Sequence, residues 1–153
     1  MFLVTERILL TVWLGSMWTV GYIVAPTLFN TLDDRMLAGQ VAGQLFSISS
    51  YIGLFCASLL LIGIIYRAPK QVVKNWRVWV LLSMLMIIVI AEFVFQPMMA
   101  ELKSQGISPG SHAARQFGQL HGTASVFFLI NSLLGLVLLV FGLNANQTNG
   151  LEN

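Results

Sequence analysis

An apolar segment that contains a carboxylate is the strongest constraint on this chain. Residues 78–100 read VWVLLSMLMIIVIAEFVFQPMMA, which is long and apolar enough to cross a bilayer. Glu92 lies inside this segment, with Gln96 one helical turn later and Pro97 next to it. A charged side chain inside a membrane span costs about 2.5–3.5 kcal/mol on insertion scales, and it usually faces a partner or a water-filled cavity. We therefore expect Glu92 to face other polar groups of the chain.

Composition places the whole chain in the membrane. Of the 153 residues, 57% are hydrophobic and 9% are charged, whereas soluble domains carry about 25% charged residues. The basic residues lie in short loops rather than along one surface stripe, which argues against nucleic-acid binding. Cys56 is the only cysteine, so an internal disulfide and a cysteine-based zinc site are excluded.

Four apolar segments predict an all-α fold, an integral membrane four-helix bundle. At a rise of about 1.5 Å per residue, each segment spans a hydrocarbon core about 30 Å thick. The expected helices are at about residues 7–29, 33–66, 77–100 and 114–143, within a single transmembrane domain over residues 1–144. We expect residues 145–153 to form a disordered tail, and its last residues resemble a remnant of protein expression.

Local signals indicate where the helices begin, end and bend. Thr31 followed by Asp34 has the spacing of a capping box, which predicts the start of the second helix. Residues 103–112 are expected to form a loop, because glycines and a proline interrupt the helical pattern there. Pro26 and Pro97 each remove a backbone donor inside a span.

The distribution of positive charge predicts the orientation. Five basic residues lie on the side that holds both termini: Arg7, Arg67, Lys70, Lys74 and Arg77. Three lie on the other side: Arg35, Lys103 and Arg115. Because lysine and arginine accumulate in cytoplasmic loops, we predict an N-in, C-in protein of the bacterial inner membrane, with both termini cytoplasmic.

Polar residues concentrate in the half of the bundle opposite the termini, and this predicts an outward-facing polar pocket between the helices. On the second helix they form one stripe at helical spacing, which includes Gln40, Gln44 and Ser47. The candidate pocket residues are Glu92, Gln96, His121, Gln44, Asn131, Ser125, Arg115 and Tyr22. No spacing among them is diagnostic of a metal site. The alternative is that the serines and amides make helix–helix hydrogen bonds and that His121 is a satisfied interfacial residue.

Four fragments of the chain resemble a known family. GYIVAPTLFNTL, AGQVAGQLF, FVFQPMMAELKSQG and ARQFGQLHGTASVFFLINSLLGL look like an uncharacterised four-helix membrane family, a bacterial domain of unknown function that is transmembrane-protein-205-like. The resemblance covers about residues 7–142. It is distantly similar to the CopD copper-resistance and HemJ protoporphyrinogen-oxidase membrane domains, which are also helical bundles. The chain lacks the histidine near the N-terminus that we would expect of HemJ, which argues against porphyrin oxidation.

Three functions are compatible with these observations. The favoured one is a membrane binding module that holds a small ligand, or a haem- or porphyrin-type cofactor, in the outward-facing pocket. The second is a membrane oxidoreductase of the protoporphyrinogen-oxidase kind, with His121 as ligand or acid–base group and Glu92 as proton acceptor. The third is a proton-coupled transporter or accessory subunit, for which a homo-oligomer would replace the missing inverted repeat. The expected partners are the lipid bilayer and a small molecule, and the sequence leaves open whether the protein is an enzyme.

Overall fold

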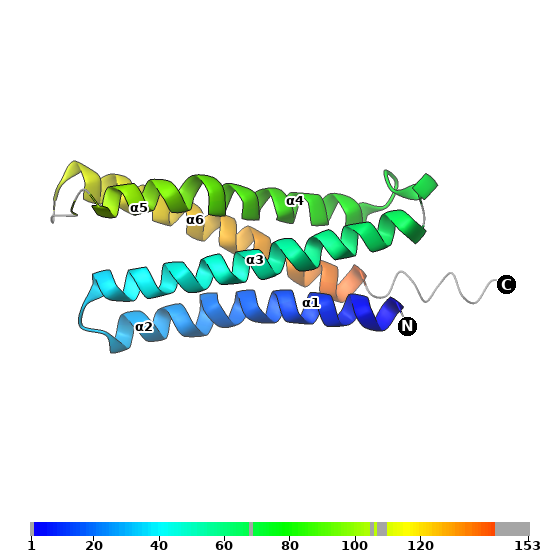
Figure 1. The fold of residues 1–153 in the computed structure, drawn as a ribbon, viewed down its shortest axis with the longest axis horizontal. Helices are drawn as coiled ribbons and strands as arrows, with labels where there is room; N and C mark the ends of the chain where they lie inside the picture. The colour runs from blue at the N-terminus through cyan, green and yellow to red at the C-terminus, as the bar shows by residue number, and fades with distance from the viewer. Residues whose placement is uncertain (1, 68, 105, 107–109, 143–153) are drawn as a thin grey trace.

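The computed structural model of this chain is a bundle of four antiparallel helices (Figure 1). The structure describes residues 2–67, 69–104, 106 and 110–142, so the expected tail at residues 145–153 lies outside the described residues. Four helical stretches are long and apolar enough to cross a membrane: Val4–Thr31, Arg35–Arg67, Trp76–Ser104 and His112–Phe141. The predicted all-α membrane bundle is therefore confirmed, and the chain is an integral membrane protein. The division into one domain and a tail stays a prediction.

The four long helices are composed of shorter segments. The first contains α1 (Phe2–Trp18), the π-helical η1 (Thr19–Val24) and α2 (Ala25–Thr31). The second is α3 (Arg35–Arg67), and a short 3₁₀ helix, η2 (Pro69–Gln71), follows it. The third contains α4 (Trp76–Ile90), the π-helical η3 (Ala91–Phe95) and α5 (Gln96–Ser104). The fourth contains α6 (His112–Val137) and the π-helical η4 (Leu138–Gly142).

The two ends of the bundle hold different connections. The start of α1, the connection from α3 to α4 and the end of η4 lie at one end, here named the terminal end (Figure 1). The connections from α2 to α3 and from α5 to α6 lie at the opposite end, here named the loop end. The half of the bundle nearest each end is named the terminal half or the loop half.

Side-chain caps begin the helices at the loop end. The Asp34 carboxylate accepts hydrogen bonds from the backbone N–H groups of Met36 (2.8 Å) and Leu37 (3.2 Å), which would otherwise have no partner in the first turn of α3. Thr31 is the last residue of α2. α3 begins at Arg35, so Asp34 is its cap and Thr31 does not form the expected capping box.

Both prolines inside the spans follow a π-helical segment. Pro26 is the second residue of α2 and Pro97 the second residue of α5. The N–H of Ala25 donates to the carbonyl of Val20, and the N–H of Gln96 donates to that of Ala91, five residues back in each case. Because a proline ring clashes with the carbonyl four residues earlier, this wider turn lets each helix continue past its proline.

The hydrophobic core lies in the terminal half. Its buried members come from all four long helices: Leu10, Trp13, Leu14, Met17, Cys56, Ala57, Leu60, Ile64, Val78, Leu81, Met84, Ile88 and Leu138. Two glycines allow the close approach. A Cβ atom on Gly53 would overlap the Trp13 ring, and one on Gly135 would overlap Leu14. Small residues at such contacts let the helix backbones approach closely. The resulting van der Waals packing helps drive helix association in membranes.

An ion cluster around the buried Glu6 closes the terminal half. Glu6 of α1 is 5% exposed and binds Arg67 at the end of α3 (2.6 Å) and Arg77 at the start of α4 (3.1 Å). The Arg77 Nε atom is buried and has no hydrogen-bond partner among the described residues. It lies against Gly142, where the negative end of the helix dipole favours a cation. The charge pattern of the sequence indicates both arginines only as loop charges and does not reveal this cluster.

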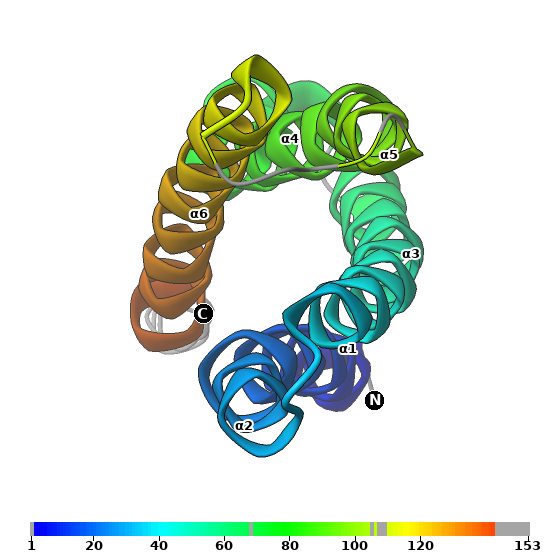
Figure 2. The same cartoon turned by 90° about the vertical axis from the view of Figure 1, so that its left-hand side faces the viewer.

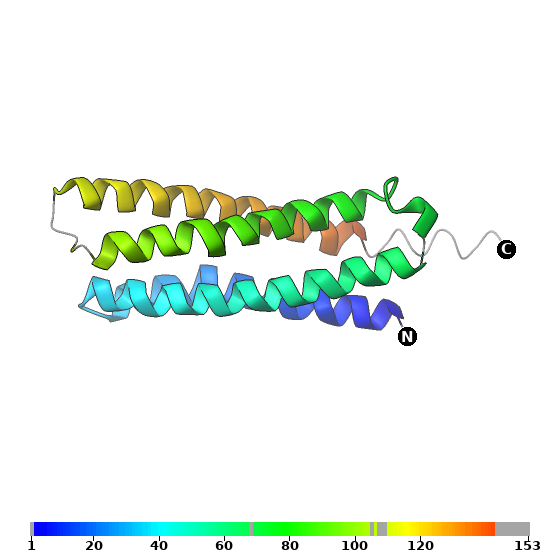
Figure 3. The same cartoon turned by 45° about the horizontal axis from the view of Figure 1, so that its top comes forward.

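The loop half is splayed. There α2 packs on α3 and α5 packs on α6, and the two pairs diverge towards the loop end (Figure 2, Figure 3). All residues of η1, α2, η3 and α5 are described, and none of them is buried. The Phe128 ring lies on the backbone of Gly21 and forms edge contacts with the rings of Tyr22 (5.4 Å between centroids) and Phe46 (5.6 Å). Three of the four long helices meet in this aromatic cluster.

Candidate functional site

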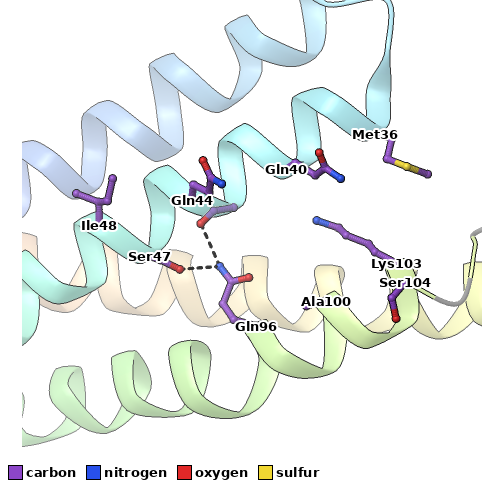
Figure 4. Close-up of a pocket in the computed structure, with 10 residues that line it drawn as sticks. Met36, Gln40, Gln44, Ser47, Ile48, Gln96, Ala100, Lys103 and Ser104 are labelled. Carbon is purple, nitrogen blue, oxygen red and sulfur yellow. Dashed lines mark hydrogen bonds between the residues drawn. The ribbon is translucent and has the colours of Figure 1, made fainter.

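A groove between α3 and α5 is the more polar of two cavities that lie along the apolar spans. Its volume is about 710 Å³, which is within the range of small-molecule sites, roughly 300–1,000 Å³. We call it the α3–α5 groove, and its lining residues are Met36, Gln40, Gly43, Gln44, Ser47, Ile48, Gln96, Ala100, Lys103 and Ser104 (Figure 4).

Helical spacing explains why these residues share the groove. On α3, Gln40, Gln44 and Ser47 follow each other at intervals of four and three residues, which places them on one face of the helix. On α5, Gln96 and Lys103 are seven residues apart, or about two helical turns. The two polar faces look towards each other across the groove (Figure 4).

Two side chains of α5 reach across the groove to the backbone of α3. The Gln96 amide donates to the carbonyl of Gly43 (3.3 Å) and to the Ser47 hydroxyl (3.5 Å). The Lys103 ammonium donates to the carbonyl of Gly39 (3.3 Å). Both carbonyls belong to glycines, so no side chain covers them. The glycine pair on α3 therefore serves as a contact surface for polar side chains rather than for a closely packed helix.

The charge of the groove is positive. Lys103 also lies over the Phe117 ring of α6, 5.5 Å from its centroid, a distance at which a cation is attracted to an aromatic face. The lining includes no aspartate or glutamate. No ion pair joins Lys103 to any carboxylate in the described part of the chain. This ammonium therefore keeps part of its hydrogen-bonding capacity for another partner.

Two of the eight candidate residues line the groove together. Gln44 and Gln96 face it from α3 and α5. Lys103 and Met36 also line it, although neither was among the candidates. Lys103 was assigned to the loop at residues 103–112, but α5 continues to Ser104. The spacing of seven residues from Gln96 is the signal that could have identified it.

Two other candidates, Tyr22 and Asn131, make polar contacts between the first and fourth long helices. Ser132 is buried and accepts hydrogen bonds from Trp18 Nε1 (2.7 Å) and from the Tyr22 hydroxyl (3.0 Å). Asn131 is 4% exposed, and its amide nitrogen contacts the sulfur of Met17 (3.6 Å). The Asn131 Oδ1 atom has no partner among the described residues.

Three candidates lie on the exposed part of α6. His121 is exposed, and its ring stacks on Phe117 at 6.1 Å between centroids. The Ser125 hydroxyl donates to the backbone carbonyl of His121 (2.9 Å). Arg115 is exposed and forms no ion pair within the described residues. None of the three lines the α3–α5 groove.

Glu92 lies in η3 and is partly exposed. In the part of the chain that the structure describes, no hydrogen bond or ion pair involves its carboxylate. It is not among the residues that line the groove, although Gln96 follows it by four positions. The structure therefore does not join Glu92 to the other candidates through polar contacts.

The described residues include no cluster of three or more histidine, cysteine, aspartate or glutamate side chains that could hold a metal ion. The groove lining supplies only the Met36 thioether as a soft ligand. Haem iron is usually held by histidine or a cysteine thiolate, so these residues do not fit a haem group. Amide, hydroxyl and ammonium groups instead suit hydrogen bonding to an organic molecule.

A second cavity of about 560 Å³ lies in the terminal half between α1 and α3. Its charged lining residues, Glu6 and Arg67, bind each other, and most of its other lining residues are apolar. The α3–α5 groove is the better candidate site, because its polar groups remain open to a ligand.

Comparison with known proteins gives one match. A family model described as a domain of unknown function, DUF4149, matches residues 8–108. No curated protein and no solved structure matches the chain. The matched range includes both polar faces of the groove, from Met36 to Ser104. This membrane-spanning helical chain belongs to the DUF4149 family, a domain of unknown function.

Proposed function

We propose that this protein is a membrane-embedded binding module that holds a small organic ligand in the α3–α5 groove. One observation carries the proposal. The Gln44 amide is exposed at the groove, within a membrane-spanning helix, and has no hydrogen-bond partner in the described part of the chain. Moving an amide from water into an apolar medium without a partner costs about 4–8 kcal/mol for cyclohexane and about 1–3 kcal/mol in proteins. A ligand or water in the groove would satisfy this amide.

The arrangement of the groove supports ligand binding over simple helix packing. Polar residues that only join helices pair with each other, as Ser132 does with Trp18 and Tyr22. In the groove, Gln96 and Lys103 contact α3, while Gln40 and Gln44 remain exposed beside them. The groove thus has both a fixed wall and unpaired groups, which is typical of a binding site.

The proposal includes an orientation. The five-to-three distribution of basic residues supports cytoplasmic termini in a bacterial inner membrane, and the groove would then face outward. A reporter that is active only in the cytoplasm, fused after residue 144, should be active. Activity instead of a reporter specific to the periplasm would reverse the orientation and place the groove on the cytoplasmic side.

Neither alternative function gains support from a specific contact. The enzymatic alternative requires His121 and Glu92 to act together, and no hydrogen bond or ion pair links these two side chains, which are both described. For proton-coupled transport, no chain of polar contacts connects the groove to the terminal end among the described residues. Ligand binding is therefore the function that this geometry supports best.

The test fills the groove with a side chain. Ser47→Phe places a ring in the groove, whereas Ser58→Phe makes the same change on the exposed side of α3. The full chain and both variants are purified in nanodiscs, and the bound small molecules are extracted and identified by mass spectrometry. We expect a compound that the unmodified protein and Ser58→Phe retain and that Ser47→Phe loses severalfold. Identical profiles for all three proteins would contradict the proposal.

A further inference from the structure

The cations in the two halves of the bundle have different partners. Arg67 and Arg77 in the terminal half both bind Glu6. Lys103 in the loop half is partly buried, and it contacts a backbone carbonyl and an aromatic ring. A cation inside a membrane span pairs with an anion or with backbone carbonyls, and of these only an anion also neutralises its charge. Lys103 has no such pair among the described carboxylates.

The surroundings of Lys103 select the charge of a ligand. Lys103 is the one charged residue among the described residues that line the groove. The other polar lining groups are neutral amides and hydroxyls. Their donors can bind the oxygen atoms of a carboxylate or phosphate, which form stronger hydrogen bonds than neutral acceptors do. A cationic ligand would meet like charge in the groove without a compensating carboxylate.

The apolar residues that line the groove indicate the shape of the ligand. Ile48 is 55% exposed at the end of the groove farther from the loops, and Met36 is 49% exposed near the loops. Both lie on the span Arg35–Arg67. An apolar chain that leaves the groove past Ile48 would therefore pass directly into lipid. A free anion lacks such a chain, so its entry into the membrane would be unfavourable.

We propose that the α3–α5 groove binds a single-chain anionic amphiphile, with its carboxylate or phosphate at Lys103 and its apolar chain directed past Ile48. This inference rests on the proposed function and names the class of ligand. Gln40 lines the same groove and directly follows Gly39, whose carbonyl Lys103 contacts, so it would help hold the same head group (Figure 4). The Gln96 amide, already fixed on α3, lines the path of the chain.

The experiment uses two photoactivatable probes with the same C16 chain, one a fatty acid and the other its neutral primary amide. Each is added to the full-length protein in phosphatidylcholine nanodiscs, and mass spectrometry locates the labelled peptides. The fatty acid should label residues 36–48 and 96–104. Labelling should fall about tenfold in Lys103→Gln, the loss of roughly one charge-assisted hydrogen bond. Lys103→Arg should retain most of it, and Lys70→Gln at the terminal end should leave it unchanged.

Competition identifies the source of the anion. Unlabelled palmitate or lysophosphatidate should displace the probe, whereas inorganic phosphate should not. Displacement by inorganic phosphate alone would show a site for a free anion and would contradict the proposal that the ligand is an amphiphile. If the neutral amide labels the groove as strongly as the acid and Lys103→Gln has no effect, the anionic inference is wrong while the proposed ligand site survives. If neither probe labels the groove and Ser47→Phe also retains the same extracted compounds as the unmodified protein, both proposals fail.

Discussion

In the terminal half, the Trp13 ring lies on the backbone of Gly53 and two arginines bind the buried Glu6. In the loop half, Gln96 and Lys103 instead reach backbone carbonyls across a groove, and no residue of α2 or α5 is buried, in helices that are described throughout. The same four long helices form both halves. The difference indicates that the terminal half holds the bundle together, while the loop half can hold a ligand at little expense to stability.

The largest expected effect tests whether the terminal half carries the stability. Glu6→Gln leaves the buried Arg77 guanidinium without its counter-charge. Removing one partner of a buried ion pair destabilises by about 3–5 kcal/mol. The free energy of unfolding in mixed micelles should fall by about this amount. Glu101→Gln, on the exposed surface of α5, is the matched control and should leave it nearly unchanged. Equal stability of the two variants would remove the distinction between the halves.

A smaller loss is expected when the close contact at Gly53 is filled. Gly53→Ala introduces a Cβ atom that overlaps the Trp13 ring, and overpacking of this kind typically costs about 1–3 kcal/mol. Gly63→Ala makes the same change on α3 where nothing lies within 4 Å. Thermal unfolding should show a lower midpoint for Gly53→Ala only. A lowered midpoint for Gly63→Ala as well would mean that glycine itself, rather than close packing, matters in α3.

The smallest stability effect is expected in the groove. Gln96→Leu removes the hydrogen bonds to Gly43 and Ser47. Such interhelical bonds contribute about 0.6 kcal/mol each on average, so the loss of both should lower the unfolding free energy by only about 1 kcal/mol. The amount of ligand retained in nanodiscs should nevertheless fall, because these bonds fix the wall of the groove between α3 and α5. Gln119→Leu on the exposed part of α6 should affect neither quantity. A large loss of stability in Gln96→Leu would make the groove a structural contact.

The sequence predicts the fold well because each span carries its own signal. Hydropathy alone locates four helices of sufficient length, and the polar stripe of α3 follows from its spacing. The ion cluster could not be predicted, because Glu6 and Arg77 are 71 residues apart and nothing local records their contact. Lys103 was missed for a different reason. The glycines and proline that follow it indicated a loop, while α5 continues one turn further than the pattern suggested.

The position of His121 shows another limit. It shares a helical face with Ser132, eleven residues or about three turns away. Ser132 is buried beside Trp18, whereas His121 is exposed. The cause is tertiary: the start of α6 lies beside α5 and away from α2, as the view from the loop end shows (Figure 2). Helical periodicity gives the side of the helix on which a residue lies. It does not show whether a neighbouring helix is present at that position along the helix axis.

The central claim, a closed terminal half and a loop half that takes a ligand, can be tested with two thiols. Cys56 is 2% exposed in the core, and Ser47→Cys adds a thiol in the groove. The measurement is the rate at which N-ethylmaleimide modifies each thiol in nanodiscs, with and without palmitate, after denatured protein has shown that both can react. We predict rapid modification at position 47 that palmitate slows, and almost none at Cys56 in either condition. Equal rates at the two positions, or a rate at position 47 that palmitate leaves unchanged, would contradict the account.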